Sequence, residues 1–101
     1  MDIKTKLINE DLHVMLIGEL DEYTAGYTRE YLDNIFSDCK FKNLIIDLSR
    51  LDFMDSTGIG VLLGRYKKLK NKNRNIYISN PSNSIEKIFN MSGIYEIMPK
   101  I

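Results

Sequence analysis

A short, strongly apolar run in the middle of the chain limits the fold more than any other feature. Leu44-Ile45-Ile46-Asp47-Leu48 places four aliphatic residues in five positions. A run of this length and composition is typical of a central strand that is covered on both faces, as in the parallel sheets of α/β proteins. The chain is therefore expected to pack helices against this strand.

Four further segments have the composition of strands. Ile3 to Ile8 alternates apolar and polar residues, and Leu12 to Leu20 is richer in aliphatic residues. These two segments are predicted to form a hairpin around Asn9-Glu10-Asp11, with Gly18 marking either a bulge or a close backbone approach near its end. A third short β run spans Ile76 to Ser79, and Tyr95-Glu96-Ile97 is predicted as a last strand.

Three segments between these strands carry apolar residues at helical spacing, and each has candidate start residues. The first helix is expected to start at Asp21 or Thr24, and the third at Asn80-Pro81 or at Asn83. Gly93 is suited to the end of the third helix. The predicted buried stripes are Tyr27, Tyr31, Leu32, Ile35 and Phe36, then Ile59, Leu62, Leu63, Tyr66 and Leu69, and finally Ile85, Ile88 and Phe89.

The resulting order is β-β-α-β-α-β-α-β, with Ser49 to Met54 as a connecting loop. Strands that are separated by helices become parallel neighbours, whereas the opening hairpin is antiparallel. We therefore expect an α/β fold with a mixed sheet flanked by helices. The 101 residues are expected to form one domain, residues 1–101.

Charge and hydropathy argue against nucleic-acid and membrane binding. Fourteen basic and fourteen acidic side chains cancel, which removes the overall attraction to polyanions. Six of the basic residues lie between Arg65 and Arg74, which we interpret as a solvated helix end. No apolar run approaches the ~18 residues of a membrane span, and no signal peptide is evident. We expect a cytoplasmic protein that binds neither nucleic acid nor membrane directly.

The residues that carry most catalytic chemistry are scarce. His13 and Cys39 are the only residues of their types, so no metal site and no Ser-His-Asp set is predicted. Gly58, Gly60 and Gly64 do not have the spacing of a dinucleotide-binding turn, and no Gly-Lys-Ser/Thr follows them. The chain is expected to need no cofactor and not to be an enzyme. An enzyme or nucleotide-binding domain that uses this glycine turn is the alternative.

Asp55-Ser56-Thr57-Gly58 lies where the connecting loop becomes the second helix. Either Asp55 or Ser56 is suited to cap that helix. Capping does not explain Gly58 and Gly60, since each weakens a helix by up to ~1 kcal/mol relative to Ala. Their lack of side chains leaves the backbone open to close approach by another molecule. A hydroxyl beside an open helix end is a plausible docking site.

The same position would serve as a switch. A phosphate on Ser56 would add about −1.5 to −2 charges at neutral pH. The free amides and the dipole of the helix N-terminus would tolerate that charge. A partner packed against the site would meet added bulk and a desolvated dianion.

Three segments resemble one family. Phe53 to Lys67 closely resembles the signature of bacterial anti-sigma factor antagonists, which carry the STAS fold, and its Leu-Gly-Arg-Tyr-Lys continuation is similar to that of sporulation members. Gly18-Glu19-Leu20-Asp21, followed by Thr24-Ala25, resembles a second segment of the family, and Met91-Ser92-Gly93-Ile94 a third. Members usually end with a further helix, whereas this sequence stops at Lys100-Ile101.

The resemblance implies a partner-switching cycle. The unmodified protein would bind an anti-sigma factor that is also a serine kinase, and a sporulation sigma factor would be released. The kinase would phosphorylate Ser56, with Thr57 as a minor competing site, and a PP2C-type phosphatase would reset the switch. A monomer is expected. The implied partner-binding residues are Glu19, Leu20, Asp21, Tyr23, Asp55, Ser56, Thr57, Gly58 and Gly60.

The circuit that the protein serves stays open at this point. One alternative is an antagonist in a stress-response sigma circuit. Another is a partner-switching scaffold that controls something other than transcription.

Overall fold

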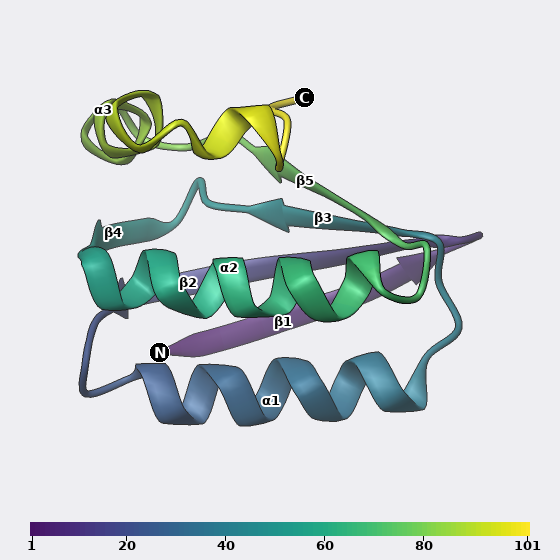
Figure 1. Cartoon of the computed structure of the whole chain (residues 1–101). Helices are drawn as coiled ribbons and strands as arrows, with labels where there is room; N and C mark the ends of the chain where they lie inside the picture. The colour runs from purple at the N-terminus through teal and green to yellow at the C-terminus, as the bar shows by residue number, and fades with distance from the viewer.

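The computed structural model describes residues 1–101 and shows five strands, three α-helices and one 3-10 turn (Figure 1). The mixed sheet with flanking helices confirms the fold class expected from the sequence. In chain order the elements are β1 (Asp2–Ile8), β2 (Asp11–Leu20), α1 (Ala25–Asp38), β3 (Asn43–Asp47), β4 (Leu51–Met54), α2 (Ser56–Lys70), β5 (Asn75–Ser79), α3 (Asn83–Ser92) and η1 (Ile94–Glu96).

The long strand β2 organises the sheet. It pairs antiparallel with β1 on one edge, as the predicted hairpin requires. On its other edge it pairs in parallel with β3 through Asp11–Met15 and with β4 through Gly18–Leu20. β5 lies in parallel outside β3, so the order is β1-β2-β3-β5 with β4 beside the end of β2. Of the two alternatives predicted for Gly18, the structure has the bulge, because the register with β4 shifts between Gly18 and Glu19 and the φ of Gly18 is +112°.

The prediction that Ser49 to Met54 forms a connecting loop was wrong for its last four residues. Leu51–Met54 is strand β4, whose backbone pairs with the last three residues of β2. β2 is ten residues long and β3 only five, so the end of β2 needs a second partner. Leu51 and Met54 are buried while Phe53 is exposed. Buried and exposed residues do not alternate along this segment as they do in a half-buried strand, so the sequence pattern does not indicate a strand here.

The predicted last strand at Tyr95-Glu96-Ile97 was also wrong. Gly93 ends α3 with a φ of +71°, as predicted, and the chain then continues as the 3-10 turn Ile94–Glu96. The Tyr95 ring packs edge-on against Phe89, with 5.5 Å between the ring centroids. The contact with the sheet comes a few residues later, where Ile78 and Lys100 form an isolated bridge.

α1 and α2 lie side by side, and both begin at the end of the molecule where β2 and β4 finish (Figure 1). In α1, Leu32 and Phe36 are buried as predicted, but Ala25 and Thr28 are buried instead of Tyr27, which is 53% exposed. The stripe that faces the core is therefore rotated toward Thr28 and Leu32, the residues that follow the two predicted tyrosines. The aromatic rings were a misleading signal because tyrosine tolerates a half-exposed position.

In α2, Leu62 and Leu69 are buried as predicted, together with Val61 and Arg65. The other predicted members of this stripe, Ile59, Leu63 and Tyr66, are only partly buried and pack at the margin of the core. In α3, Ile85 and Phe89 are buried as predicted. The third helix starts at Asn83, the second of the two predicted positions, but its cap is Ser82, whose Oγ accepts from the Ile85 amide at 3.4 Å.

Arg65 is not part of a solvated helix end. Its side chain is only 7% exposed, and its Nε lies 2.9 Å from Asp33 Oδ1 on α1, although the two are not aligned for a hydrogen bond. Burial lowers the pKa of Arg65, and the nearby Asp33 carboxylate opposes that shift. Lys68 reaches the other oxygen of Asp33 at 2.8 Å. Two cations of α2 thus hold one carboxylate of α1, which helps to set the spacing of the two helices.

No helix in the structure combines the length and the apolar composition that crossing a membrane requires.

Gly58 allows α2 to approach the sheet closely. A Cβ atom at this position would lie 2.6 Å from Met54 Cγ and 2.8 Å from the Leu20 carbonyl oxygen. The sequence-based interpretation that Gly58 leaves its backbone open to another molecule is therefore corrected. Its missing side chain is needed for packing within the protein. A Cβ atom at Gly60 would have no neighbouring atom within 4 Å, so there is open space beside this glycine.

We predict that Gly58→Ala lowers the free energy of unfolding by about 1–3 kcal/mol, because backbone and side-chain atoms must move to admit the methyl group. Gly64→Ala is the matched control, since the same helix has open space there. The control should be neutral or stabilising by up to about 1 kcal/mol. Urea denaturation of both variants measures the difference, and equal stabilities would contradict the packing role of Gly58.

Candidate functional site: a docking surface at the start of α2

Asp55, and not Ser56, caps α2. Its backbone is extended, and its Oδ1 accepts a hydrogen bond from the Gly58 amide at 3.1 Å. Ser56 is the first residue of the helix and is exposed. Because Asp55 satisfies the helix amide, the Ser56 hydroxyl makes no hydrogen bond within the protein and is free to react or to bind.

The loop between β2 and α1 is held in one conformation by a reciprocal pair of side chains. Asp21 Oδ1 accepts from the amides of Tyr23 at 2.9 Å and of Thr24 at 3.1 Å. Thr24 Oγ1 in turn accepts from the Asp21 amide at 3.1 Å and donates to the Glu19 carbonyl at 2.8 Å. Thr24 occupies the cap position of α1, but its side chain makes no capping hydrogen bond. Both predicted residues therefore shape the loop before the helix.

The structure brings the two loops to the same end of the sheet. β2 and β4 are parallel, and Glu19 and Leu20 stand in register with Phe53 and Met54. The segments that follow these strands therefore leave from neighbouring points. Most of the implied partner-binding residues reach the surface there, but two do not. Leu20 is fully buried, and Gly58 is buried against it.

Phe53 is a surface residue, although its sequence position suggested a connecting loop and the start of the segment that resembles the family signature. Its side chain is 47% exposed on β4, opposite Glu19 and three positions before Ser56. Tyr23 is 87% exposed on the neighbouring loop. Large aromatic side chains held at the surface by ordered backbone are frequent anchors of protein interfaces. Only the pairing of β4 with β2 reveals that Phe53 points outward.

We define the docking surface as Glu19, Asp21, Tyr23, Phe53, Asp55, Ser56, Thr57 and Gly60.

The shape and charge of the docking surface favour a protein partner. None of its residues lines any of the hollows in the molecular surface. It carries three carboxylates and no Lys or Arg. No three His, Cys, Asp or Glu side chains anywhere in the structure come together as a metal-binding group. A flat, acidic surface with two exposed aromatic rings is suited to a partner that supplies cations and apolar contacts.

The STAS domain family profile matches residues 2–101. This chain belongs to the STAS domain family. The match confirms the resemblance found in the sequence, and it runs through every element that builds the docking surface.

Two relatives illustrate the range of the family. The anti-sigma F factor antagonist of Paenibacillus polymyxa is 35% identical over 88 residues, which cover 87% of this chain and 75% of the relative. The anti-sigma-B factor antagonist of Staphylococcus aureus is 30% identical over 98 residues, which cover 97% of this chain and 90% of the relative.

Solved structures show the same fold. The anti-sigma factor antagonist SpoIIAA in its unphosphorylated form superposes with a TM-score of 0.83 at 27% identity, covering 99% of this chain and 88% of that one. The phosphorylated form of the Bacillus cell fate determinant SpoIIAA gives a TM-score of 0.75 at 28% identity, with 99% and 91% coverage.

We predict that Asp55→Ala lowers the free energy of unfolding by about 1 kcal/mol, because the Gly58 amide loses its capping acceptor. Ser56→Ala should change it by less than about 0.5 kcal/mol, since no hydrogen bond of the fold involves the Ser56 hydroxyl. Thermal denaturation of the two variants separates the cap from the free hydroxyl. A larger loss for Ser56→Ala would reverse the assignment.

Proposed function

We propose that this STAS protein is an anti-sigma factor antagonist. Its unmodified docking surface binds an anti-sigma factor that is also a serine kinase, and a sigma factor is thereby released. The observation that carries the proposal is the exposed and unengaged hydroxyl of Ser56 at the start of α2, beside two exposed aromatic rings. The names of the relatives and of the solved structures support the same role.

The switching step is a phosphoryl transfer to Ser56. The hydroxyl oxygen of Ser56 attacks the γ-phosphorus of ATP held by the kinase, its proton leaves, and ADP is released. A PP2C-type phosphatase then hydrolyses the phosphoserine to restore the hydroxyl and free phosphate. The antagonist supplies only the nucleophile, so it needs no catalytic residue or cofactor of its own.

The fold can tolerate the phosphate. Ser56 stands at the N-terminus of a helix of 15 residues, where free amides and the helix dipole favour a negative charge. The Asp55 cap and the Gly58 contact do not involve the Ser56 side chain. The relative SpoIIAA has been solved both unphosphorylated and phosphorylated, and both forms share the fold of this chain.

The phosphate would lower the affinity of the docking surface for its partner, although it leaves the fold intact. The docking surface already carries three carboxylates, and phosphoserine would add about −1.5 to −2 charges in their midst. A partner that buries Ser56 would meet added bulk and would have to desolvate this dianion, while the cations that it supplies are already matched to the three carboxylates. Phosphorylation therefore ends the complex without refolding the antagonist.

The proposed circuit is sporulation, with the cytoplasm as the compartment and a monomer as the acting form. The sporulation assignment follows the 35% identity to the anti-sigma F factor antagonist. The 30% identity to an anti-sigma-B factor antagonist favours a stress-response circuit as the second candidate. Pairwise binding to anti-sigma factors of both kinds from the same organism distinguishes the two circuits.

Incubation with the cognate anti-sigma kinase and ATP should add one phosphate, which mass spectrometry should locate on Ser56. Ser56→Ala should abolish the modification, while Thr57→Ala should retain it because Thr57 is half-buried. Phosphorylation of Ser56→Ala at the wild-type rate would place the site elsewhere.

In calorimetry, Ser56→Asp should weaken binding to the anti-sigma factor by at least about tenfold, and unchanged affinity would reject the charge mechanism.

We predict that Phe53→Ala weakens binding to the anti-sigma factor by about tenfold or more, as expected for an aromatic anchor near the centre of an interface. Met91→Ala is the control, because Met91 is 89% exposed and lies outside the docking surface. The control should bind with wild-type affinity. Equal affinities for the two variants in surface plasmon resonance would remove Phe53 from the docking surface.

A further inference from the structure

Two tyrosines on the outer side of α1 line a hollow in the protein surface. The rings of Tyr27 and Tyr31 have 6.1 Å between their centroids and are inclined to each other by 40°. They line a hollow of about 260 Å³, and Glu30 and Asn34 complete its lining. We call this site the α1 hollow. Tyr27 is 53% exposed, and Glu30 and Asn34 are exposed as well.

The side of α1 that carries the hollow is uncovered. α2 runs along one side of α1, and no further helix lies on the other side (Figure 1). Asp33 marks the side that faces α2, because it holds Lys68 of that helix at 2.8 Å. Positions 27, 30, 31 and 34 have the spacing of a single helix face. The side chains of the α1 hollow are therefore open to another molecule.

The charge of the α1 hollow is negative. Glu30 forms no ion pair. Arg29 is the only cation of α1, and residues two positions apart on a helix do not face each other, so Arg29 points away from Tyr27 and Tyr31. One nitrogen of its guanidinium is accordingly buried. Glu22 adds an exposed carboxylate just before the helix. A cation that enters the hollow would therefore meet Glu30 unopposed.

The α1 hollow continues the docking surface. Tyr23 belongs to that surface and is 87% exposed, and Tyr27 follows it four positions later. The chain between them forms a helical turn, because the Ala25 amide donates to the Asp21 carbonyl. Four residues of helix span about 6 Å. A partner that covers Tyr23 therefore reaches the hollow one turn further along α1.

We propose that the α1 hollow binds an arginine side chain of the protein that occupies the docking surface. The planar guanidinium lies over the tyrosine rings, where a cation is attracted by the aromatic faces. Its N–H groups donate from the edge of the same plane to the Glu30 carboxylate and the Asn34 amide oxygen. This contact rests on the proposed function, because the anti-sigma factor is the protein that supplies the arginine.

An arginine fits the α1 hollow better than a lysine or an apolar side chain. A lysine ammonium is a compact, strongly hydrated charge, and it cannot lie flat on a ring while its edge bonds a carboxylate. An apolar side chain would cover the Glu30 carboxylate without pairing it, which costs free energy.

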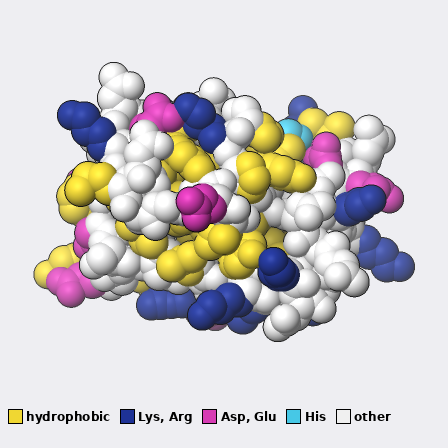
Figure 2. All heavy atoms as spheres, turned by 45° about the horizontal axis from the view of Figure 1, so that its top comes forward, with side chains coloured by type: hydrophobic (Ala, Val, Ile, Leu, Met, Phe, Trp, Pro, Cys, Tyr) yellow, Lys and Arg dark blue, Asp and Glu magenta, His cyan; other side chains and the backbone are white.

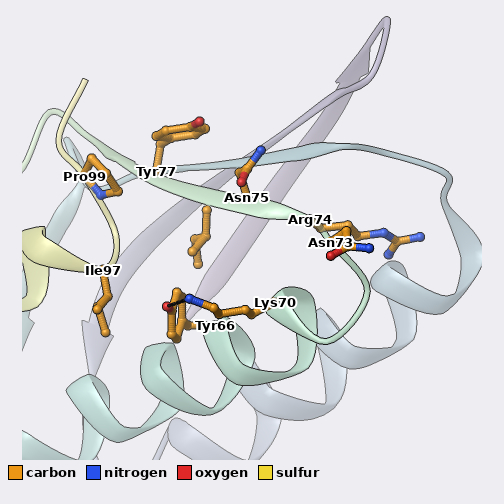
Figure 3. A pocket seen from close by; sticks show the side chains of 9 residues that line it. Tyr66, Lys70, Asn73, Arg74, Asn75, Tyr77, Ile97 and Pro99 are labelled. Atoms are coloured by element: carbon orange, nitrogen blue, oxygen red, sulfur yellow. Dashed lines mark hydrogen bonds between the residues drawn. The ribbon is translucent and has the colours of Figure 1, made fainter.

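Two other regions of the surface have the opposite charge. The larger hollow beside β5 has Lys70 and Arg74 as the only charged residues of its lining (Figure 3). On the face that carries α3 and the C-terminal segment, hydrophobic side chains gather in the middle, and Lys and Arg side chains lie along the lower margin (Figure 2). These cations repel an arginine, so the hollow beside β5 serves as an internal control.

The direct test uses a capped Gly-Arg-Gly peptide and needs no anti-sigma factor. Capped Gly-Lys-Gly and Gly-citrulline-Gly peptides are the comparisons, since citrulline keeps the shape of arginine without its charge. In NMR titrations of the full chain, the arginine peptide should shift the amides of residues 27–34 and leave those of residues 70–77 unchanged. It should bind at least about threefold more tightly than either comparison peptide. Equal binding of the three peptides, or shifts confined to other regions, would overturn the proposal.

Variants identify the groups that hold the arginine. Glu30→Gln should weaken binding of the arginine peptide by about threefold, because the carboxylate charge is lost. Asp38→Asn is the matched control, with the same charge change on an exposed residue of the same helix outside the hollow, and it should leave the affinity unchanged. Tyr27→Leu should weaken binding by about twofold or more, whereas Tyr27→Phe keeps the ring and should keep the affinity. Equal effects within either pair of variants would contradict the assigned contacts.

Binding of the anti-sigma factor separates this inference from the proposed function. In surface plasmon resonance at low ionic strength, Glu30→Gln should weaken binding by about threefold and Asp38→Asn should not. If Phe53→Ala weakens binding and Glu30→Gln does not, the docking surface stands and the α1 hollow lies outside the interface. If the arginine peptide binds but the anti-sigma factor does not, the proposed function fails, and with it the source of the arginine. A dimer that forms through α1 in sedimentation experiments would make a second copy the occupant and overturn the proposal.

Discussion

The pairing of β2 with two successive strands on one edge is the constraint on which the rest of the structure depends. β3 and β4 lie end to end beside β2 and run in its direction. Helices that follow parallel strands start from the same edge of a sheet. α1 and α2 therefore both begin where β2 and β4 finish, and the loop around Asp21 comes to lie beside Ser56. Without β4, the end of β2 would be an unpaired edge, and the docking surface would lose the strand that supports it.

The contacts that support the docking surface do not involve the Ser56 side chain. The hydrogen bonds of Asp21 and Thr24 hold one loop, and the Asp55 cap holds the other. Gly58 sets the depth at which α2 sits on Leu20 and Met54. None of these contacts uses the Ser56 hydroxyl, so the proposed phosphorylation would change the charge of the surface and leave its support intact. The proposed switch would therefore act on the affinity for the partner and not on the stability of the antagonist.

α2 holds Ser56 in place because its later turns are anchored to the rest of the protein. Its first residue is Ser56, and its last turn contains the buried Leu69. The buried Arg65 between them is held by Asp33 of α1, which fixes the helix against its neighbour.

Local signals were enough to predict the mixed α/β fold, a helix that begins near Ser56, an irregularity at Gly18 and the end of α3 at Gly93. Each of these depends on residues within a few positions, through periodicity, capping or backbone conformation. The sequence could not show that Leu51–Met54 is a strand, that Phe53 faces outward, that Arg65 is buried or that Gly58 faces inward. Those properties depend on which distant segment lies opposite, and hydrogen bonding and packing between remote segments decide that only in the folded chain.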